Sequence, residues 1–77
     1  MNYSEIAHDV AELWHGVDVV EVCSTHVIFS VPKDSEQIVA TLYDSIFDCG
    51  GFVKDAPPVV EVFEHYNEIT FYWEHNA

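Results

Sequence analysis

The sequence has no arginine and only two lysines, against 14 aspartates and glutamates in 77 residues. Its formal net charge at neutral pH is −12. Direct nucleic-acid binding needs Lys and Arg to displace counterions from phosphates, and anionic membrane surfaces attract the same residues. The shortage of basic side chains therefore argues against both activities. It favours a partner whose own surface is basic.

Cysteines are also few, and long apolar runs are lacking. Cys23 and Cys49 could pair, but two cysteines do not make a disulfide framework. No secretory signal pattern is visible, so we expect a cytoplasmic protein. Hydrophobic residues nevertheless make up 49% of the chain and aromatic residues 14%. This composition is too apolar for a disordered acidic tail, and it predicts a single folded domain spanning residues 1–77.

The first third of the chain predicts a helix and a hairpin. Residues 3–15 place Ile6, Val10, Leu13 and Trp14 at helical spacing, with Asn2 as the N-cap and Gly16 as the stop. Residues 17–31 then read as two β-branched strands around a turn at Ser24-Thr25, and Pro32 closes the unit.

The rest of the chain repeats this order. A second helix is expected from about Ser35 to Cys49, capped by Asp34 and ended by Gly50-Gly51. Its buried stripe is Ile38, Leu42 and Ile46, flanked by Val39, Tyr43 and Phe47. After a loop that ends at Pro57-Pro58, a second hairpin is expected from Val59 to Glu64 and Glu68 to His75, with the turn around His65-Tyr66-Asn67.

The two halves share a sequence pattern that suggests an internal repeat. Residues 19–22 and 59–62 are both Val-Val-Glu-Val, and Val27-Ile28-Phe29 is taken as the counterpart of Ile69-Thr70-Phe71. We therefore expect an α+β fold of two αββ units, residues 1–32 and 33–77. The simplest architecture is a four-stranded antiparallel sheet with both helices on one face, although the strand order stays open.

Strand alternation assigns two faces to this sheet. The helix-covered face would carry Val20, Val22, Val27, Phe29, Val60, Val62, Ile69, Phe71 and Trp73. The opposite face would mix acidic, polar and aromatic side chains, namely Glu21, Cys23, His26, Ile28, Ser30, Glu61, Phe63, Glu68, Thr70, Tyr72 and Glu74. Aromatic side chains surrounded by charge are typical of a partner site.

The residues expected to contact a partner fall into two groups. On the sheet they are Glu21, Glu61, Phe63, Glu68, Tyr72 and Glu74. On the helices they are Glu5, Asp9, Glu12, Asp44 and Asp48, where spacings of three or four residues place charges on one face. Such rows could imitate the charges of a nucleic-acid backbone, whereas the alternative is a solvated surface that only keeps the protein soluble.

Catalytic and metal signatures are weak. His8 and His15 are seven residues apart, too far for the i, i+4 pair that holds zinc on a helix. Cys23 and His26 could become neighbours across their turn, but no pocket or oxyanion donor is evident. We therefore expect no enzyme activity, no cofactor and no metal.

A small, acidic, arginine-free domain suits an inhibitor that occupies the basic channel of a nucleic-acid-binding protein. Phage anti-defence proteins, such as anti-CRISPR or anti-restriction proteins acting as DNA mimics in the host cytoplasm, have this physical character. Two alternatives remain open. One is an antitoxin or immunity protein that neutralises a basic toxin, and the other is a homodimeric structural or assembly subunit packed through the sheet.

Overall fold

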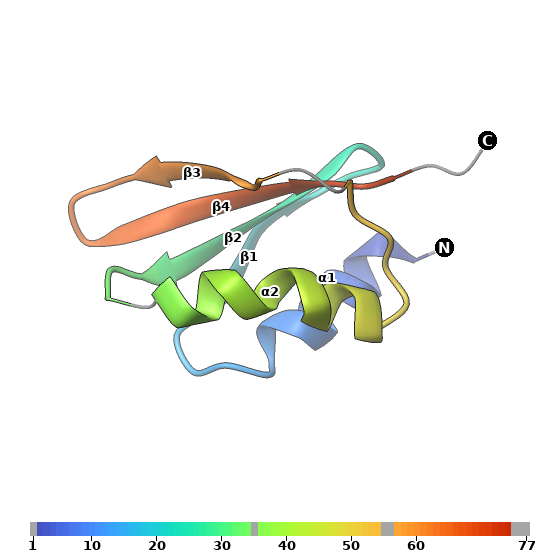
Figure 1. The fold of residues 1–77 in the computed structure, drawn as a ribbon, viewed down its shortest axis with the longest axis horizontal. Helices are drawn as coiled ribbons and strands as arrows, with labels where there is room; N and C mark the ends of the chain where they lie inside the picture. The colour runs from blue at the N-terminus through green and yellow to red at the C-terminus, as the bar shows by residue number, and fades with distance from the viewer. Residues whose placement is uncertain (1, 35, 55–56, 75–77) are drawn as a thin grey trace.

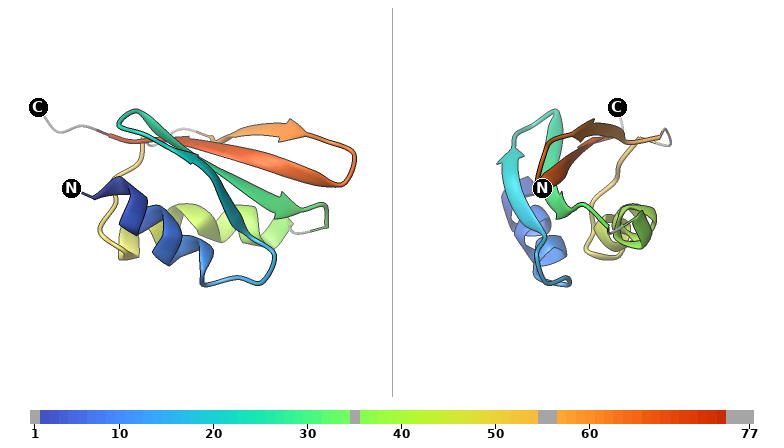
Figure 2. Two further views of the ribbon diagram at one scale, coloured as in Figure 1. Left: turned by 180° about the vertical axis from the view of Figure 1, so that it is seen from behind. Right: turned by 90° about the vertical axis from the view of Figure 1, so that its left-hand side faces the viewer.

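The computed structural model describes residues 2–34, 36–54 and 57–74. The chain order is α1 (Tyr3–Ala11), β1 (Asp18–Val22), β2 (His26–Pro32), α2 (Glu36–Asp48), β3 (Val59–Val62) and β4 (Tyr66–Tyr72). Two helices and an antiparallel four-stranded sheet place the protein in the α+β class, as the sequence predicted. Figures 1 and 2 show the helices beneath the sheet.

The sheet has the strand order β1-β2-β4-β3, which answers the question that the sequence left open. Each hairpin supplies one central and one edge strand, and the two hairpins meet where β2 pairs with β4 from His26–Tyr72 to Pro32–Tyr66. All described strand pairs are antiparallel, so the second strand of each hairpin is hydrogen-bonded on both sides. The most regular part of the sheet is therefore the central β2–β4 pair.

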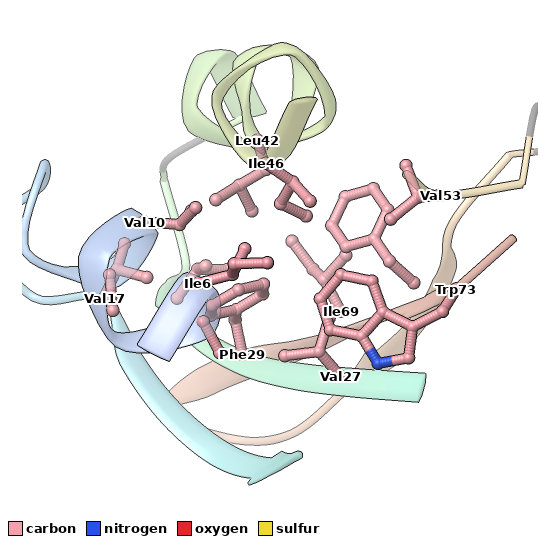
Figure 3. Close-up of a cluster of buried hydrophobic side chains, with 14 residues drawn as sticks. Ile6, Val10, Val17, Val27, Phe29, Leu42, Ile46, Val53, Ile69 and Trp73 are labelled. Carbon is pink, nitrogen blue, oxygen red and sulfur yellow. The ribbon is translucent and has the colours of Figure 1, made fainter. Parts of the chain in front are cut away.

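The core lies between the helices and one face of this central pair (Figure 3). Alternate residues of β2 and β4 point into it, and Trp73, which follows β4, is 1% exposed. The predicted pattern of the central strands is thus confirmed. The buried cluster draws on both helices, both central strands and the connecting segments: Ile6, Ala7, Val10, Ala11, Val17, Val27, Phe29, Val31, Leu42, Ile46, Val53, Ile69, Phe71 and Trp73.

Helix α1 begins as predicted but ends earlier. The side chain of Asn2 accepts a hydrogen bond from the backbone N–H of Glu5 at 3.0 Å, which caps the first turn. The helix ends at Ala11, because the N–H groups of Leu13 and Trp14 donate to carbonyls three residues back and tighten the chain into a turn. Leu13, expected in the buried stripe, is consequently 60% exposed.

Helix α2 ends in the glycine pair that the sequence identified. The N–H of Gly51 donates to the carbonyl of Ile46 at 2.9 Å, and the N–H of Gly50 donates to that of Phe47, the pattern of a Schellman cap. Gly50 has a φ of 94°. Phe47, expected on the buried stripe, is instead exposed and contacts Phe52 edge-on. The expected helix start at Ser35 lies outside the described residues.

A β-bulge in β1 changes which side chains face the core. Val19 pairs with Phe29 and Glu21 pairs with Ile28, so Val20 is the extra residue. Val19 therefore packs against the core, while Val20, predicted to be buried, is 50% exposed. The bulge also places Asp18 on the opposite face of the sheet, because the alternation restarts on its N-terminal side.

The edge strand β3 is exposed on both faces, which contradicts the predicted burial of Val60 and Val62. Val62 is 69% exposed. Figures 1 and 2 show the reason: the β3–β4 hairpin (orange) projects beyond the start of α2, so no helix covers its tip. A valine that was not expected in the core is buried instead: Val53, in the loop after α2, forms an isolated bridge with Trp73 and is 2% exposed.

The second hairpin also turns earlier than predicted. Its turn is Glu64-His65, and Tyr66 already belongs to β4. Both hairpins close with the same hydrogen bond, from Cys23 to His26 and from Phe63 to Tyr66, each at 3.0 Å. Val22 pairs with Val27 as Val62 pairs with Asn67. Counted from the turn, Asn67 rather than Ile69 holds the position in the second hairpin that Val27 holds in the first, two residues from the expected match.

Candidate interaction surface on the sheet

The face of the sheet that points away from the core is called here the outer sheet face. The strand register and the alternation of side chains along each strand show which residues it carries. They form three rows that run across the strands and a further group at the tip of the β3–β4 hairpin. Its members are Asp18, Glu21, Cys23, His26, Ile28, Ser30, Pro32, Val59, Glu61, Phe63, Tyr66, Glu68, Thr70 and Tyr72.

One row across all four strands is acidic. Asp18 pairs with Ser30, Ser30 with Glu68, and Glu68 with Glu61. We call these four residues the acidic row. Neighbouring strands are ~4.8 Å apart, so the side chains of Glu61 and Glu68 are direct neighbours, and that of Asp18 lies two strands from Glu68 and three from Glu61. Like charges directly opposite each other destabilise a sheet, which makes this arrangement costly for the fold.

No cation of this chain neutralises the acidic row within the described residues. Between residues 2–34, 36–54 and 57–74, the only ion pairs join His26 to Glu21 and His65 to Glu64. Lys54 instead lies over the ring of Tyr72, with its Nζ 5.8 Å from the ring centroid. The negative potential of the outer sheet face therefore stays available to an external cation.

Apolar side chains flank the acidic row on both sides. At the hairpin tip, the rings of Phe63 and Tyr66 stack at 5.0 Å between centroids. On the other side, the next cross-strand row consists of Glu21, Ile28, Thr70 and Val59, in which Ile28 and the exposed Val59 are apolar. A partner that covers the acidic row would therefore also bury apolar and aromatic area.

The structure divides the predicted contact residues between two sides. Glu21, Glu61, Phe63, Glu68 and Tyr72 lie together on the outer sheet face, and Glu74 follows β4 next to Trp73. The helical acids are exposed as well, but they lie on or directly after helices beneath the sheet: Glu5, Asp9, Glu12, Asp44 and Asp48. One flat partner surface cannot contact both groups at once.

Asp18 was missed by the sequence reasoning. Strict alternation backwards from Glu21 assigns Asp18 to the core face, and only the bulge at Val20 brings it to the outer sheet face. The sequence signal that could have found it is the charge itself, because an unpaired carboxylate is rarely buried.

The structure also brings Cys23 and His26 together, as their positions on either side of the turn suggested. The Sγ of Cys23 lies 3.5 Å from Nδ1 of His26, and both cysteines are free thiols. Glu21, expected to contact a partner, accepts a hydrogen bond from Nε2 of His26 at 2.8 Å. Among the described residues, no group of three His, Cys, Asp or Glu side chains has the geometry to hold a metal ion.

In comparisons with known proteins, no family model, curated protein or solved structure matches this chain. In the part of the chain that the structure describes, no helix is long and apolar enough to cross a membrane. Function must therefore be argued from the site itself.

Proposed function

We propose that the protein binds the basic surface of a nucleic-acid-binding protein through its outer sheet face and thereby competes with the nucleic acid. The observation that carries the proposal is the acidic row, in which Glu61 and Glu68 oppose each other directly and no cation of the described chain compensates them. Long-range attraction would steer a basic partner to this face and raise the association rate.

The flanking apolar residues supply the second component of binding. Charge complementarity gives specificity and association rate more than affinity, whereas buried aromatic anchors hold a complex together. The Phe63–Tyr66 stack and Tyr72 lie at opposite ends of the outer sheet face and are suited to that role. A homodimer through this face is disfavoured, because it would bring two acidic rows together.

We also interpret the architecture as two αββ units whose helices share one face of the sheet. The identical turn hydrogen bonds of the two hairpins support the repeat. In this interpretation the repeat explains why Glu21 and Glu61 occupy equivalent positions, opposite Ile28 and Glu68.

The test compares two variants of equal net charge. In the sheet variant, Asp18→Asn, Glu61→Gln and Glu68→Gln remove the acidic row with little change in volume. In the helix variant, Asp9→Asn, Glu12→Gln and Asp44→Asn remove three charges from exposed positions elsewhere. Each protein is immobilised and used to capture proteins from a bacterial lysate at low salt. The captured proteins are identified and then tested for DNA or RNA binding in the presence of each variant.

The expected result is that the original chain and the helix variant capture the same nucleic-acid-binding protein and displace its DNA or RNA. The sheet variant should bind it at least about tenfold more weakly, which corresponds to ~1.4 kcal/mol, and with a flatter salt dependence. Equal capture by both variants would contradict the proposal. Capture of a basic toxin without nucleic-acid competition would favour an immunity protein, and a salt-resistant dimer with no captured partner would favour a structural subunit.

A further inference from the structure

A second cluster of side chains surrounds the turn between β1 and β2, and we call it the thiol cluster: Cys23, Thr25, His26 and Glu21. The Oγ1 of Thr25 lies 3.2 Å from Sγ of Cys23 and 2.8 Å from Nδ1 of His26. The Nε2 of His26 lies 2.8 Å from Oε2 of Glu21. A nucleophile, a base and a group that orients the base are thus connected in one chain of contacts.

The direction of each hydrogen bond follows from the carboxylate. Ionised Glu21 can only accept, so Nε2 of His26 must donate and Nδ1 of the neutral ring must accept. Thr25 therefore donates its hydroxyl hydrogen to Nδ1, and its oxygen is free to accept from the thiol of Cys23. The proton of Cys23 thereby has a path through Thr25 to His26. The resulting imidazolium would be stabilised by Glu21.

The turn that carries this cluster is fixed to the core. The indole N–H of the buried Trp73 donates to the carbonyl of Cys23 at 2.9 Å, and the backbone N–H of Trp73 donates to the carbonyl of Thr25 at 3.1 Å. In the equivalent turn of the second hairpin, the positions of Cys23 and His26 are occupied by Phe63 and Tyr66, whose side chains are aromatic rings that stack on each other. The fixed polar arrangement thus belongs to one hairpin alone.

We propose that the thiol cluster is a nucleophilic site at which Cys23 undergoes thiol–disulfide exchange with small cationic disulfides. The sulfur of Cys23 attacks one sulfur of a disulfide R–S–S–R, a Cys23–S–S–R bond forms, and the original S–S bond breaks. The thiol proton passes by way of Thr25 to His26, and RS⁻ takes up a proton to leave as RSH. Cys23 is oxidised and the small disulfide is reduced, so no further oxidant is needed.

The thiolate form is favoured by local hydrogen bonds. Once the proton has moved to His26, the hydroxyl of Thr25 accepts from Nδ1 and donates to Sγ of Cys23. The pKa of Cys23 lies below its ordinary value of 9.0, first because of this hydrogen bond from the Thr25 side chain and then because of backbone hydrogen bonds from Thr25 and His26. Cys23 is exposed, so a small disulfide can reach its sulfur. An open hollow lined by Thr25, Lys54, Tyr72, Trp73 and Glu74 adjoins the cluster and offers room for the reagent.

The preference for a cationic reagent follows from the charges around the cluster. Within the cluster His26 contacts Glu21, Tyr72 packs edge-on against His26, and Lys54 and Glu74 line the adjoining hollow. These nearby charges nearly compensate each other, so the net charge of −12 decides the long-range field. A disulfide with ammonium groups is therefore attracted and one with carboxylates is repelled. This inference does not depend on the proposed basic protein partner.

The experiment uses a Cys49→Ser protein, so that Cys23 is the only thiol. It is treated with cystamine, which is cationic, and with dithiodiglycolate, which is anionic, and the mixed disulfide is followed by mass spectrometry. At low ionic strength cystamine should react at least about tenfold faster than the anionic reagent, and the difference should shrink severalfold in 1 M salt. Equal rates with both reagents at low salt would contradict the proposed preference.

Two substitutions at Thr25 test whether the reactivity of Cys23 depends on the Thr25 hydroxyl or only on the exposure of the thiol. Thr25→Val removes the hydroxyl but keeps the carbonyl that Trp73 holds, and it should move the pH midpoint of the reaction with neutral iodoacetamide upward. Thr25→Ser keeps the hydroxyl and should restore the original midpoint. The proposal fails if Thr25→Val leaves the midpoint unchanged, or if the folded Cys49→Ser protein has the same midpoint as its urea-unfolded form. Circular dichroism of each variant verifies that it is folded.

Discussion

Glu61 on β3 and Glu68 on β4 lie directly opposite each other across an antiparallel strand pair. Two carboxylates at such positions repel each other, and no described lysine or histidine is paired with either of them. The sheet therefore carries a locally unfavourable contact at the centre of its proposed binding surface. A functional site often holds residues that the fold alone would not choose.

The first prediction is that removing one of these charges stabilises the protein. Glu68→Gln keeps the shape of the side chain and abolishes the repulsion, so the free energy of unfolding should rise by a few tenths of a kcal/mol, up to ~1 kcal/mol. Urea unfolding at low and high salt measures this. The gain should be larger at low salt, because salt screens the repulsion in the original chain.

A matched control uses Glu12→Gln, which removes an equal charge from an exposed position that does not face another carboxylate on a neighbouring strand. If Glu12→Gln stabilises the protein as much as Glu68→Gln does, the effect comes from net charge alone. In that case the opposition of Glu61 and Glu68 has no energetic consequence of its own.

Periodicity predicted the elements of this fold better than their boundaries. Helical spacing and strand alternation gave the α+β class and the central β2–β4 core, because each pattern reports which residues share a face. Three features could not be obtained this way. The bulge at Val20 adds one residue to β1, Val60 is exposed on the edge strand β3, and Val53 is buried where it forms a bridge with Trp73.

The candidate site was predicted in part for the same reason. Glu61, Glu68, Phe63 and Tyr72 were assigned to one face by alternation, and that assignment holds because β3 and β4 have no bulge in their pairing. Asp18 was missed because the bulge in β1 reverses its side. The hydrogen bonds that connect Cys23 with Thr25 depend on the turn geometry, which residue spacing does not reveal.

The second prediction tests the exposure of β3. Val→Thr replaces a methyl group with a hydroxyl at almost constant volume. Its effect on the free energy of unfolding therefore depends on how deeply the side chain is buried. Val31, on the central strand β2, is 1% exposed, and Val31→Thr should lower the free energy of unfolding by about 1–3 kcal/mol. Val60→Thr should change it by less than about 0.5 kcal/mol. Chemical denaturation measures both, and similar losses at the two positions would mean that β3 is covered.

The third prediction concerns the glycine pair after α2, where two physical effects act at neighbouring positions. At Gly50, with its φ of 94°, any side chain meets backbone strain but no neighbour within 4 Å. Gly50→Ala should therefore destabilise the protein by about 1–2 kcal/mol, and Gly50→Asn by less, because Asn tolerates positive φ better. Thermal unfolding of both variants measures the order.

At Gly51 the obstacle to a side chain is the lack of space between neighbouring residues. A Cβ there would lie 2.7 Å from Cγ2 of Ile46 and 3.1 Å from Cγ2 of Ile6, so Gly51→Ala should cost about 1–3 kcal/mol through overpacking. The larger Asn should cost more than Ala at this position, which reverses the order at Gly50. If Asn costs less than Ala at both positions, or more than Ala at both, a single effect, either backbone strain or lack of space, governs both glycines.

The last prediction is a pH dependence of stability that belongs to Cys23. Its pKa in the folded chain is lowered from 9.0 by the hydrogen bonds of Thr25 and His26. Between the folded and the unfolded pKa, the unfolded chain therefore binds more protons than the folded chain, and the free energy of unfolding rises with pH. The contribution is complete above about pH 9, and it is lost as the pH falls through the folded pKa. Urea unfolding is measured against pH, under reducing conditions, for the Cys49→Ser protein and for the same protein with Cys23→Ser added. The difference between their free energies of unfolding isolates the contribution of Cys23 from that of the other titrating groups. A difference that stays constant with pH, or that falls as pH rises, would show that the hydrogen bonds around Cys23 do not favour its thiolate.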